Sequence, residues 1–254
     1  MNKIVIFLAL VCCFNICLSQ NNQGIIIYKK EILEYLSEKD EFIKNNKILK
    51  SQYYLSVQEI DLNVKELLKD INYKLIFNSD VSVFEAGSYL ELGNNKYYNS
   101  AVGPYGRGIY FTDIKKNEYY TQLDAYGELF LIKNSKADWE LLNETKKIGN
   151  YLCYKATTIR ITQGREGIIK SPVIAWYAPE LAVPFGPIGF GGLPGLIIEL
   201  EIKSFKFYVS KVNLNPKGNI NVKLPSKGRV VTKNEFDEIG MGMMGNLRKL
   251  NRKQ

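Results

Sequence analysis

The sequence predicts a mainly β protein of the α+β kind, built on a curved antiparallel sheet or half-barrel of about ten strands with an internal amphipathic helix and a C-terminal helix. Two observations support this fold class. Apolar and aromatic side chains alternate with polar ones over most of the chain, as in half-buried antiparallel strands, and helical spacing of apolar residues is clear in two segments. A sheet of that many strands in one small domain must curl or pair with a second sheet.

The expected strands are short runs in which every second side chain is apolar. These runs are Tyr73, Leu75 and Phe77; Ile109 and Phe111; Leu129 and Leu131; Val173, Ala175 and Tyr177; Leu196, Ile198, Leu200 and Ile202; Phe205, Phe207 and Val209; and Ile220, Val222 and Leu224. Glycine, asparagine and proline residues separate them. We therefore expect neighbouring strands to follow one another as a meander.

The first expected helix extends from Val57 to Ile71, where apolar residues recur at helical spacing. Ser56 followed by Glu59 resembles a capping box at its start. We expect this helix to lay one apolar face on the sheet. The charged segment 31–52 before it fits no single element.

The second expected helix begins after Thr232, whose hydroxyl can cap the first turn while Glu235 reaches back. Its apolar spacing continues to Leu250. Three glycines weaken it by up to about 1 kcal/mol each relative to alanine, so it should form only when docked on the rest of the protein.

The N-terminal segment has the pattern of a secretory signal peptide. Lys3 precedes the apolar run 4–16, which is too short for a comfortable membrane anchor, and Cys17 and Ser19 are small residues at the two positions that signal peptidase inspects. We expect residues 1–19 to be the signal peptide and residues 20–254 to be one domain without a transmembrane span. An uncleaved anchor is the alternative.

Composition excludes several kinds of chemistry. Histidine is absent from all 254 residues, which rules out histidine general bases, nucleophiles paired with histidine and zinc sites built on imidazole. Cys153 is the one cysteine outside the signal, so no disulfide forms within the mature chain, and its strand-like surroundings indicate a buried apolar role. We identify no catalytic set, no cofactor motif, no metal site and no nucleic-acid motif.

The formal net charge is +8, and basic residues gather at the C-terminus. This cluster comprises Arg248, Lys249, Arg252 and Lys253. It suits peripheral contact with anionic lipid or with an acidic partner. The alternative is a solvated end with favourable charge at a helix C-terminus.

Residues 184–195 differ from the rest of the chain, because they hold five glycines and three prolines. Such a segment cannot be regular, and we expect a defined tight loop that leads directly into a strand at Leu196. Leu193-Pro194-Gly195 suits a type II turn with glycine at the third position. Phe185, Ile188 and Phe190 are too apolar for an idle loop in solvent, so the loop must pack against something.

The hexapeptide Gly192-Leu193-Pro194-Gly195-Leu196-Ile197 resembles the signature of the GLPGLI family, exported proteins of the Bacteroidota. Trp176, Gly186, Pro187 and Phe190 also resemble that family's pattern. The resemblance implies a location in the envelope and association with outer-membrane transport systems, and it implies no settled activity. The architecture is similar, more loosely, to the outer-membrane lipoprotein carrier fold.

Three hypotheses about function follow. The first is a non-catalytic binding or accessory protein, in the periplasm or at the outer-membrane periphery of a Gram-negative bacterium, whose apolar concave face receives an apolar ligand or an envelope protein. The second is a carboxylate-dependent enzyme or cation-binding protein, because Glu199 and Glu201 share one face of a strand. The simpler and favoured explanation of that pair is two solvated residues on the polar face of a sheet, because Leu196, Ile198, Leu200 and Ile202 already supply the buried face. The third is a purely structural protein in which the hexapeptide only turns the sheet.

Overall fold

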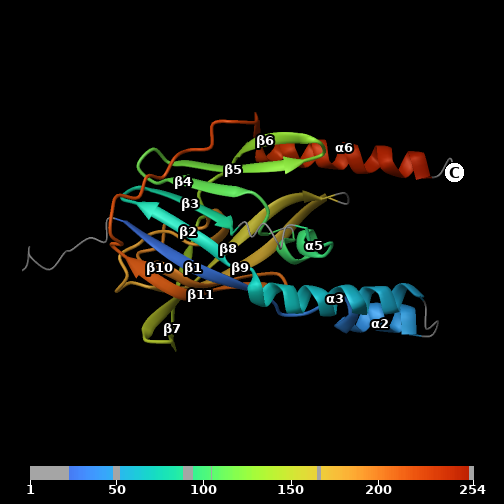
Figure 1. Ribbon diagram of the computed structural model, residues 1–254, viewed down its shortest axis with the longest axis horizontal. Helices are drawn as coiled ribbons and strands as arrows, with labels where there is room; N and C mark the ends of the chain where they lie inside the picture. The colour runs from blue at the N-terminus through green and yellow to red at the C-terminus, as the bar shows by residue number, and fades with distance from the viewer. Residues whose placement is uncertain (1–22, 48–51, 88–93, 104, 165–166, 252–254) are drawn as a thin grey trace, which may run out of the picture.

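A computed structural model describes residues 23–47, 52–87, 94–103, 105–164 and 167–251, so the expected signal peptide lies outside the described residues (Figure 1). Strands make up 48% of the chain and helices 22%, which confirms the mainly β class. The strands form one open, curved sheet of twelve strands. Of the eleven pairs of neighbouring strands, ten are antiparallel, and the pair of β12 and β6 is parallel.

The strands succeed one another as two meanders that β1 joins in the middle of the sheet, in the order β12-β6-β5-β4-β3-β2-β1-β11-β10-β9-β8-β7. Their bounds are β1 Gln23–Ile32, β2 Tyr73–Asn78, β3 Val81–Ala86, β4 Ile109–Asp113, β5 Glu118–Ala125, β6 Glu128–Lys133, β7 Glu140–Ile148, β8 Tyr151–Gly164, β9 Gly167–Ala178, β10 Leu196–Ile202, β11 Phe205–Leu214 and β12 Arg229–Thr232. The helical elements are η1 Leu36–Glu38, α2 Asp40–Lys47, α3 Gln52–Asp70, α5 Tyr98–Val102, η2 Pro187–Gly189 and α6 Lys233–Asn251. The expected meander is therefore confirmed.

The prediction of a strand around Ile220 to Leu224 is wrong. Residues 219–227 form no ladder, and side chains of the sheet hold their backbone instead: Asn78 donates to the Ile220 carbonyl at 2.6 Å and Gln122 to the Lys227 carbonyl at 2.8 Å. The strands beneath this segment are internal to the sheet, so both of their edges are already paired. Because those strands offer no free edge, the segment cannot add to the sheet as a strand and lies across its face.

Helix α3 confirms the first expected helix, although it begins at Gln52 and not at Ser56. The Ser56 hydroxyl donates to the Gln52 carbonyl one turn earlier at 2.8 Å, so it does not cap the helix. The C-terminal half of α3 buries Val64, Leu67 and Leu68 in the main core, whereas Leu62 is 62% exposed. Only this half covers the sheet, and the N-terminal half runs outward beside α2 (Figure 1).

Helix α6 confirms the second expected helix and its capping box. The Glu235 amide donates to the Thr232 hydroxyl at 3.2 Å, and the Thr232 amide donates to the Glu235 carboxylate at 2.7 Å. The helix contacts β6 and β12 at one end of the sheet order and β8 near the other. It therefore bridges the gap that the open sheet leaves, and its C-terminal half extends beyond the sheet (Figure 1).

None of the helices in the described segments is both long and apolar enough to cross a membrane.

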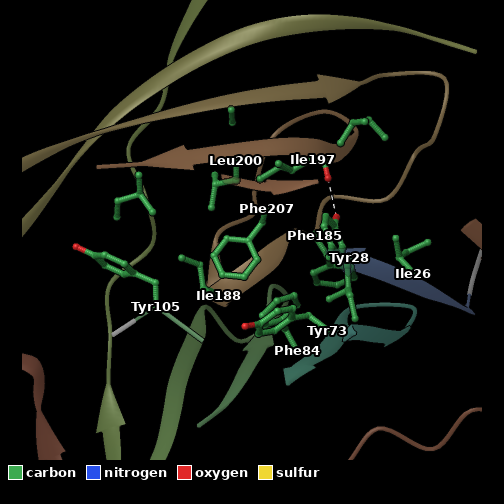
Figure 2. Packing of buried hydrophobic residues seen from close by; sticks show 14 of the residues in the cluster. Ile26, Tyr28, Tyr73, Phe84, Tyr105, Phe185, Ile188, Ile197, Leu200 and Phe207 are labelled. Atoms are coloured by element: carbon green, nitrogen blue, oxygen red, sulfur yellow. Dashed lines mark hydrogen bonds between the residues drawn. The ribbon is translucent and has the colours of Figure 1, made fainter. Parts of the chain in front are cut away.

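The main core lies on the concave face of the sheet and is rich in aromatic rings (Figure 2). Tyr73 stacks on Phe84 with ring centroids 5.9 Å apart, and Phe207 meets both rings edge-on. Edge-to-face and offset pairs of this kind add about 0.5–1.5 kcal/mol each beyond their buried area. The Tyr28 hydroxyl, fully buried among them, donates to the Ile197 carbonyl at 2.6 Å.

Lys30 is a buried charge on the same concave face, only 3% exposed. Its ammonium donates to the carbonyls of Ala101 and Val102, at 3.1 and 2.6 Å, and lies 4.5 Å from the centroid of the Phe205 ring. These carbonyls close the C-terminal end of α5, which is thereby tied to β1. Burial lowers the pKa of Lys30 from 10.5 to about 7.

A substitution at Lys30 should change the pH dependence of stability. Between pH 7 and 10.5 the unfolded chain binds more protons than the folded chain, so this amine makes stability rise with pH in that window and level off below it. We expect Lys30→Met to lose this slope, which is at most about 1.4 kcal/mol per pH unit. Urea unfolding at pH 7, 8 and 9 measures it. Lys29→Met, on the opposite face of β1, is the control, and equal slopes in the two variants would contradict the prediction.

Candidate functional site

The glycine- and proline-rich segment forms a defined loop between β9 and β10. It leaves the sheet after Ala178 and returns at Leu196, whose amide donates to the Leu181 carbonyl at 3.0 Å. Within the loop, the Gly192 amide donates to the Pro184 carbonyl at 2.9 Å. The apolar side chains of Phe185, Ile188 and Leu193 are buried, which confirms that the loop packs on the rest of the protein.

The prediction of a type II turn with glycine at its third position is wrong at Gly195. A type II turn with glycine at its third position needs a positive φ there, but Gly195 is not among the residues with positive φ, whereas Gly192 has φ +84°. The reason for glycine at 195 is space: a Cβ would lie 2.3 Å from the Ala178 carbonyl oxygen and 2.8 Å from the Pro179 Cα. The two ends of the loop pass too closely for any side chain.

The tip of the loop, η2, fills part of the concave face. It contacts β3, β4 and β5, on the far side of the sheet from the strands that carry the loop. Ile188 in η2 is buried with φ 50° and ψ 35°, a left-handed conformation that a β-branched residue rarely adopts. Figure 2 shows Ile188 beside Phe207, from β11, among the core side chains.

Trp139 supports the loop from outside, a contact that the sequence patterns did not indicate. Its indole nitrogen donates to the Gly191 carbonyl at 2.9 Å, and its ring lies 5.7 Å from that of Phe190. Trp139 is one of two tryptophans in the chain and lies directly before β7. Its residue type and this position are the sequence features that could have pointed to it. Gly186, like Gly195, has no room for a side chain, because a Cβ there would lie 2.6 Å from the Ile197 side chain.

The structure separates Trp176 and the carboxylate pair from the loop tip. Glu199 and Glu201 share the face of β10 opposite the core, as the alternation predicts, and Glu199 lies opposite Trp176 in the ladder. Lys146 lies 2.5 Å from the Glu199 carboxylate and 4.4 Å from the centroid of the Trp176 ring. Within the described segments, no group of three or more cysteine or acidic side chains could hold a metal ion.

Cys153 packs in the main core, near the charges of Glu199 and Lys146. It is fully buried, and burial together with the nearby Glu199 carboxylate raises the pKa of its thiol to about 11. The thiol is therefore unreactive at neutral pH, in agreement with the apolar role expected for it.

A chamber of about 480 Å³ remains beside the loop tip. Its walls come from five parts of the chain: β4 and β5, the segment between β6 and β7, β8, the loop tip and the start of α6. The lining residues are Tyr110, Phe111, Tyr119, Tyr120, Thr121, Asn134, Ser135, Lys136, Ala137, Asp138, Thr158, Ile159, Arg160, Ile161, Ile188, Gly189, Phe190, Lys233 and Asn234.

The chamber is aromatic and carries positive charge. The Arg160 guanidinium lies 5.1 Å from the centroid of the Tyr105 ring, and no carboxylate within the described part of the chain forms an ion pair with it. Burial raises the pKa of Tyr110 to about 12, although Arg160 acts in the opposite direction. Lys233 is neutralised by Asp237, so Arg160 and Lys136 outweigh Asp138 as the free charges in the lining. The arrangement suits an anionic group on an apolar body.

Of the residues predicted for the site, only Phe190 lines this chamber, while Pro187 lies next to it in η2. Gly192 and Pro194 are exposed, and Leu193 and Leu196 are core residues. The basic residues Arg248 and Lys249 fall in the last turns of α6, and Arg252 and Lys253 lie outside the described residues.

Comparison with known proteins adds little. No family model matches the chain, and no curated protein matches it. Among solved structures, two crystal forms of PNGF-II, in space groups P21 and C2, are similar at 15% and 16% sequence identity, each with a TM-score of 0.44. The likeness covers 84% of this chain, which spans 31% of the PNGF-II chain. A likeness this weak carries no argument about function.

Replacing Gly195 by alanine should destabilise the protein. The new Cβ would overlap the backbone of Ala178 and Pro179, and overpacking of this kind costs about 1–3 kcal/mol. Gly242→Ala is the matched control, because a Cβ at this position in α6 meets nothing within 4 Å and alanine should stabilise the helix by about 1 kcal/mol. Urea unfolding followed by circular dichroism compares the two, and a Gly195→Ala variant as stable as the unchanged protein would refute the packing explanation.

Proposed function

We propose that this chain is an exported, non-catalytic binding or accessory protein of the bacterial envelope, in the periplasm or at the outer-membrane periphery, and that its ligand occupies the chamber beside Ile188. One observation carries the proposal: an aromatic chamber of about 480 Å³ lies within the size range of ligand pockets, about 300–1,000 Å³. The resemblance of the hexapeptide to the GLPGLI family supports the location and an association with outer-membrane transport.

The strained loop tip supports a binding role. A left-handed conformation at a β-branched residue costs about 1–3 kcal/mol and persists only where its surroundings hold it. Ile188 is held by the bonds of the loop and by β3 to β5. The result is a rigid wall, so the protein loses less conformational entropy when a ligand binds.

The chemistry of the lining favours an amphipathic ligand. Tyr110, Tyr119 and Phe190 offer aromatic faces, and Arg160 offers a guanidinium without a carboxylate partner in the described segments. A planar guanidinium binds carboxylate, sulfonate or phosphate oxygens through paired hydrogen bonds. We propose an apolar body with one anionic group.

The alternatives have less support. The second hypothesis needs Glu199 as a free acid, base or cation ligand, but Lys146 already binds its carboxylate. The third, a purely structural role, implies that filling the chamber has no effect beyond stability. A peripheral contact of Arg248, Lys249, Arg252 and Lys253 with anionic lipid or an acidic partner remains part of the proposal, and α6 extends away from the sheet towards that end (Figure 1).

A tryptophan in the chamber should weaken the binding of an aromatic anion. Thr158 shares the concave face of β8 with its ladder partner Val173, whereas Thr157 faces the other side with Ile174. We expect the unchanged protein to bind anilinonaphthalene sulfonate at one site, Thr158→Trp to bind at least tenfold more weakly, and Thr157→Trp to bind normally. Fluorescence titration measures the affinities and thermal unfolding checks the fold.

Comparison of Thr158→Trp with Thr157→Trp tests whether the dye binds in the chamber. Equal affinities in the two tryptophan variants would place the dye elsewhere and remove the chamber as the site. Native mass spectrometry of protein purified from its own envelope tests the proposal independently, because a binding protein should carry a ligand or partner that Thr158→Trp lacks.

A further inference from the structure

The far half of β8 has an unpaired edge. Strand β8 runs from Tyr151 to Gly164, and β9 pairs with it along the range Tyr154 to Gly164. On its other side, β7 pairs with β8 only as far as Thr157. Beyond Thr157, no other described strand pairs with β8 on that side.

Gln163 shows to which side of β8 the backbone amides and carbonyls point. Its amide donates to the Asp237 carboxylate of α6 at 3.3 Å, so the backbone of Gln163 points away from β9. Successive strand residues point their backbone groups to opposite sides. Ile161 and Ile159 therefore also turn their amides and carbonyls away from β9, towards the gap that α6 bridges.

The same edge faces the chamber. Four consecutive residues, Thr158 to Ile161, line it, although their side chains alternate between the two faces of the sheet. A strand lines a space with consecutive residues when it presents its edge and not one of its faces. Across the chamber lies the segment 134–138, which crosses from β6 to β7.

Backbone groups at a strand edge need regularly spaced partners. Donors and acceptors on one edge recur every second residue, about 6.8 Å apart, a spacing that another extended chain matches along its whole length. Arg160 and Lys136 outweigh Asp138 in the lining, so acidic side chains complement the charge.

We infer that the chamber binds an extended, acidic and apolar peptide segment of a partner protein, which adds as a strand to the β8 edge at Ile159 and Ile161. The inference rests on the proposed function, because it names the ligand class of the same chamber. Backbone hydrogen bonds to the edge supply affinity, the aromatic lining takes apolar side chains, and Arg160 receives a carboxylate.

Proline at position 161 tests the backbone contact. The probe is the blocked peptide Val-Glu-Val-Glu-Val, with Val-Lys-Val-Lys-Val as the charge control. Ile161→Pro and Ile161→Ala both lose the isoleucine side chain, but only proline loses the amide, and an outward-facing edge position tolerates proline. We expect Ile161→Pro to weaken binding at least fivefold more than Ile161→Ala, and the lysine peptide to bind at least tenfold more weakly than the glutamate peptide.

Amide hydrogen exchange in the unchanged protein supplies a second measurement, which holds even where Ile161→Pro does not fold. Addition of the glutamate peptide should slow exchange at Ile159 and Ile161 at least tenfold. Equal affinities of the two Ile161 variants, or unchanged exchange at both amides, would overturn strand addition. If anilinonaphthalene sulfonate still binds and responds to Thr158→Trp, the proposed function survives that result. If neither probe binds, both proposals fail.

Discussion

One constraint governs this structure: a twelve-stranded sheet that curls without closing must fill its hollow and cover its ends. The loop between β9 and β10 answers the first need, because its tip reaches across to β3, β4 and β5. Helix α6 answers the second by contacting β6 and β12 on one side and β8 on the other. Where these two elements leave space between them, the chamber remains, so the candidate site is a direct product of incomplete closure.

Alternation of apolar side chains predicted the mainly β class, because period two is a local property of the chain. The number of alternating runs predicted the curvature, and the turn residues between them predicted the meander. Alternation failed at Ile220, where it reflects a segment lying across the sheet and bound by Asn78. It also misjudged Gly195, since a close approach between the two ends of a loop leaves no mark in local sequence. The capping box at Thr232 was predictable because all of its partners lie within one turn.

The candidate site could not be predicted in the same way. Its walls come from segments far apart in the sequence, such as β4, β8 and the loop tip, and no local pattern brings them together. Arg160 appeared as an ordinary polar residue of a strand, and its meaning depends on Tyr105 beneath it and on the lack of an acidic neighbour within the described segments. The hexapeptide drew attention to the loop between β9 and β10. Its own residues shape that loop, whereas Ile188 and Phe190, which precede the hexapeptide, line the chamber.

Two cations on the concave face differ in whether the fold satisfies their hydrogen-bond donors. Tyr105 and Phe205 form a ring pair 5.3 Å apart, with the Lys30 ammonium over Phe205 and the Arg160 guanidinium over Tyr105. The protein itself satisfies Lys30, because two carbonyls at the end of α5 accept hydrogen bonds from its ammonium. The Arg160 guanidinium has five N–H donors, and no side chain or carbonyl of the described chain accepts a hydrogen bond from them. A ligand with an anionic oxygen would therefore satisfy Arg160 as the α5 carbonyls satisfy Lys30.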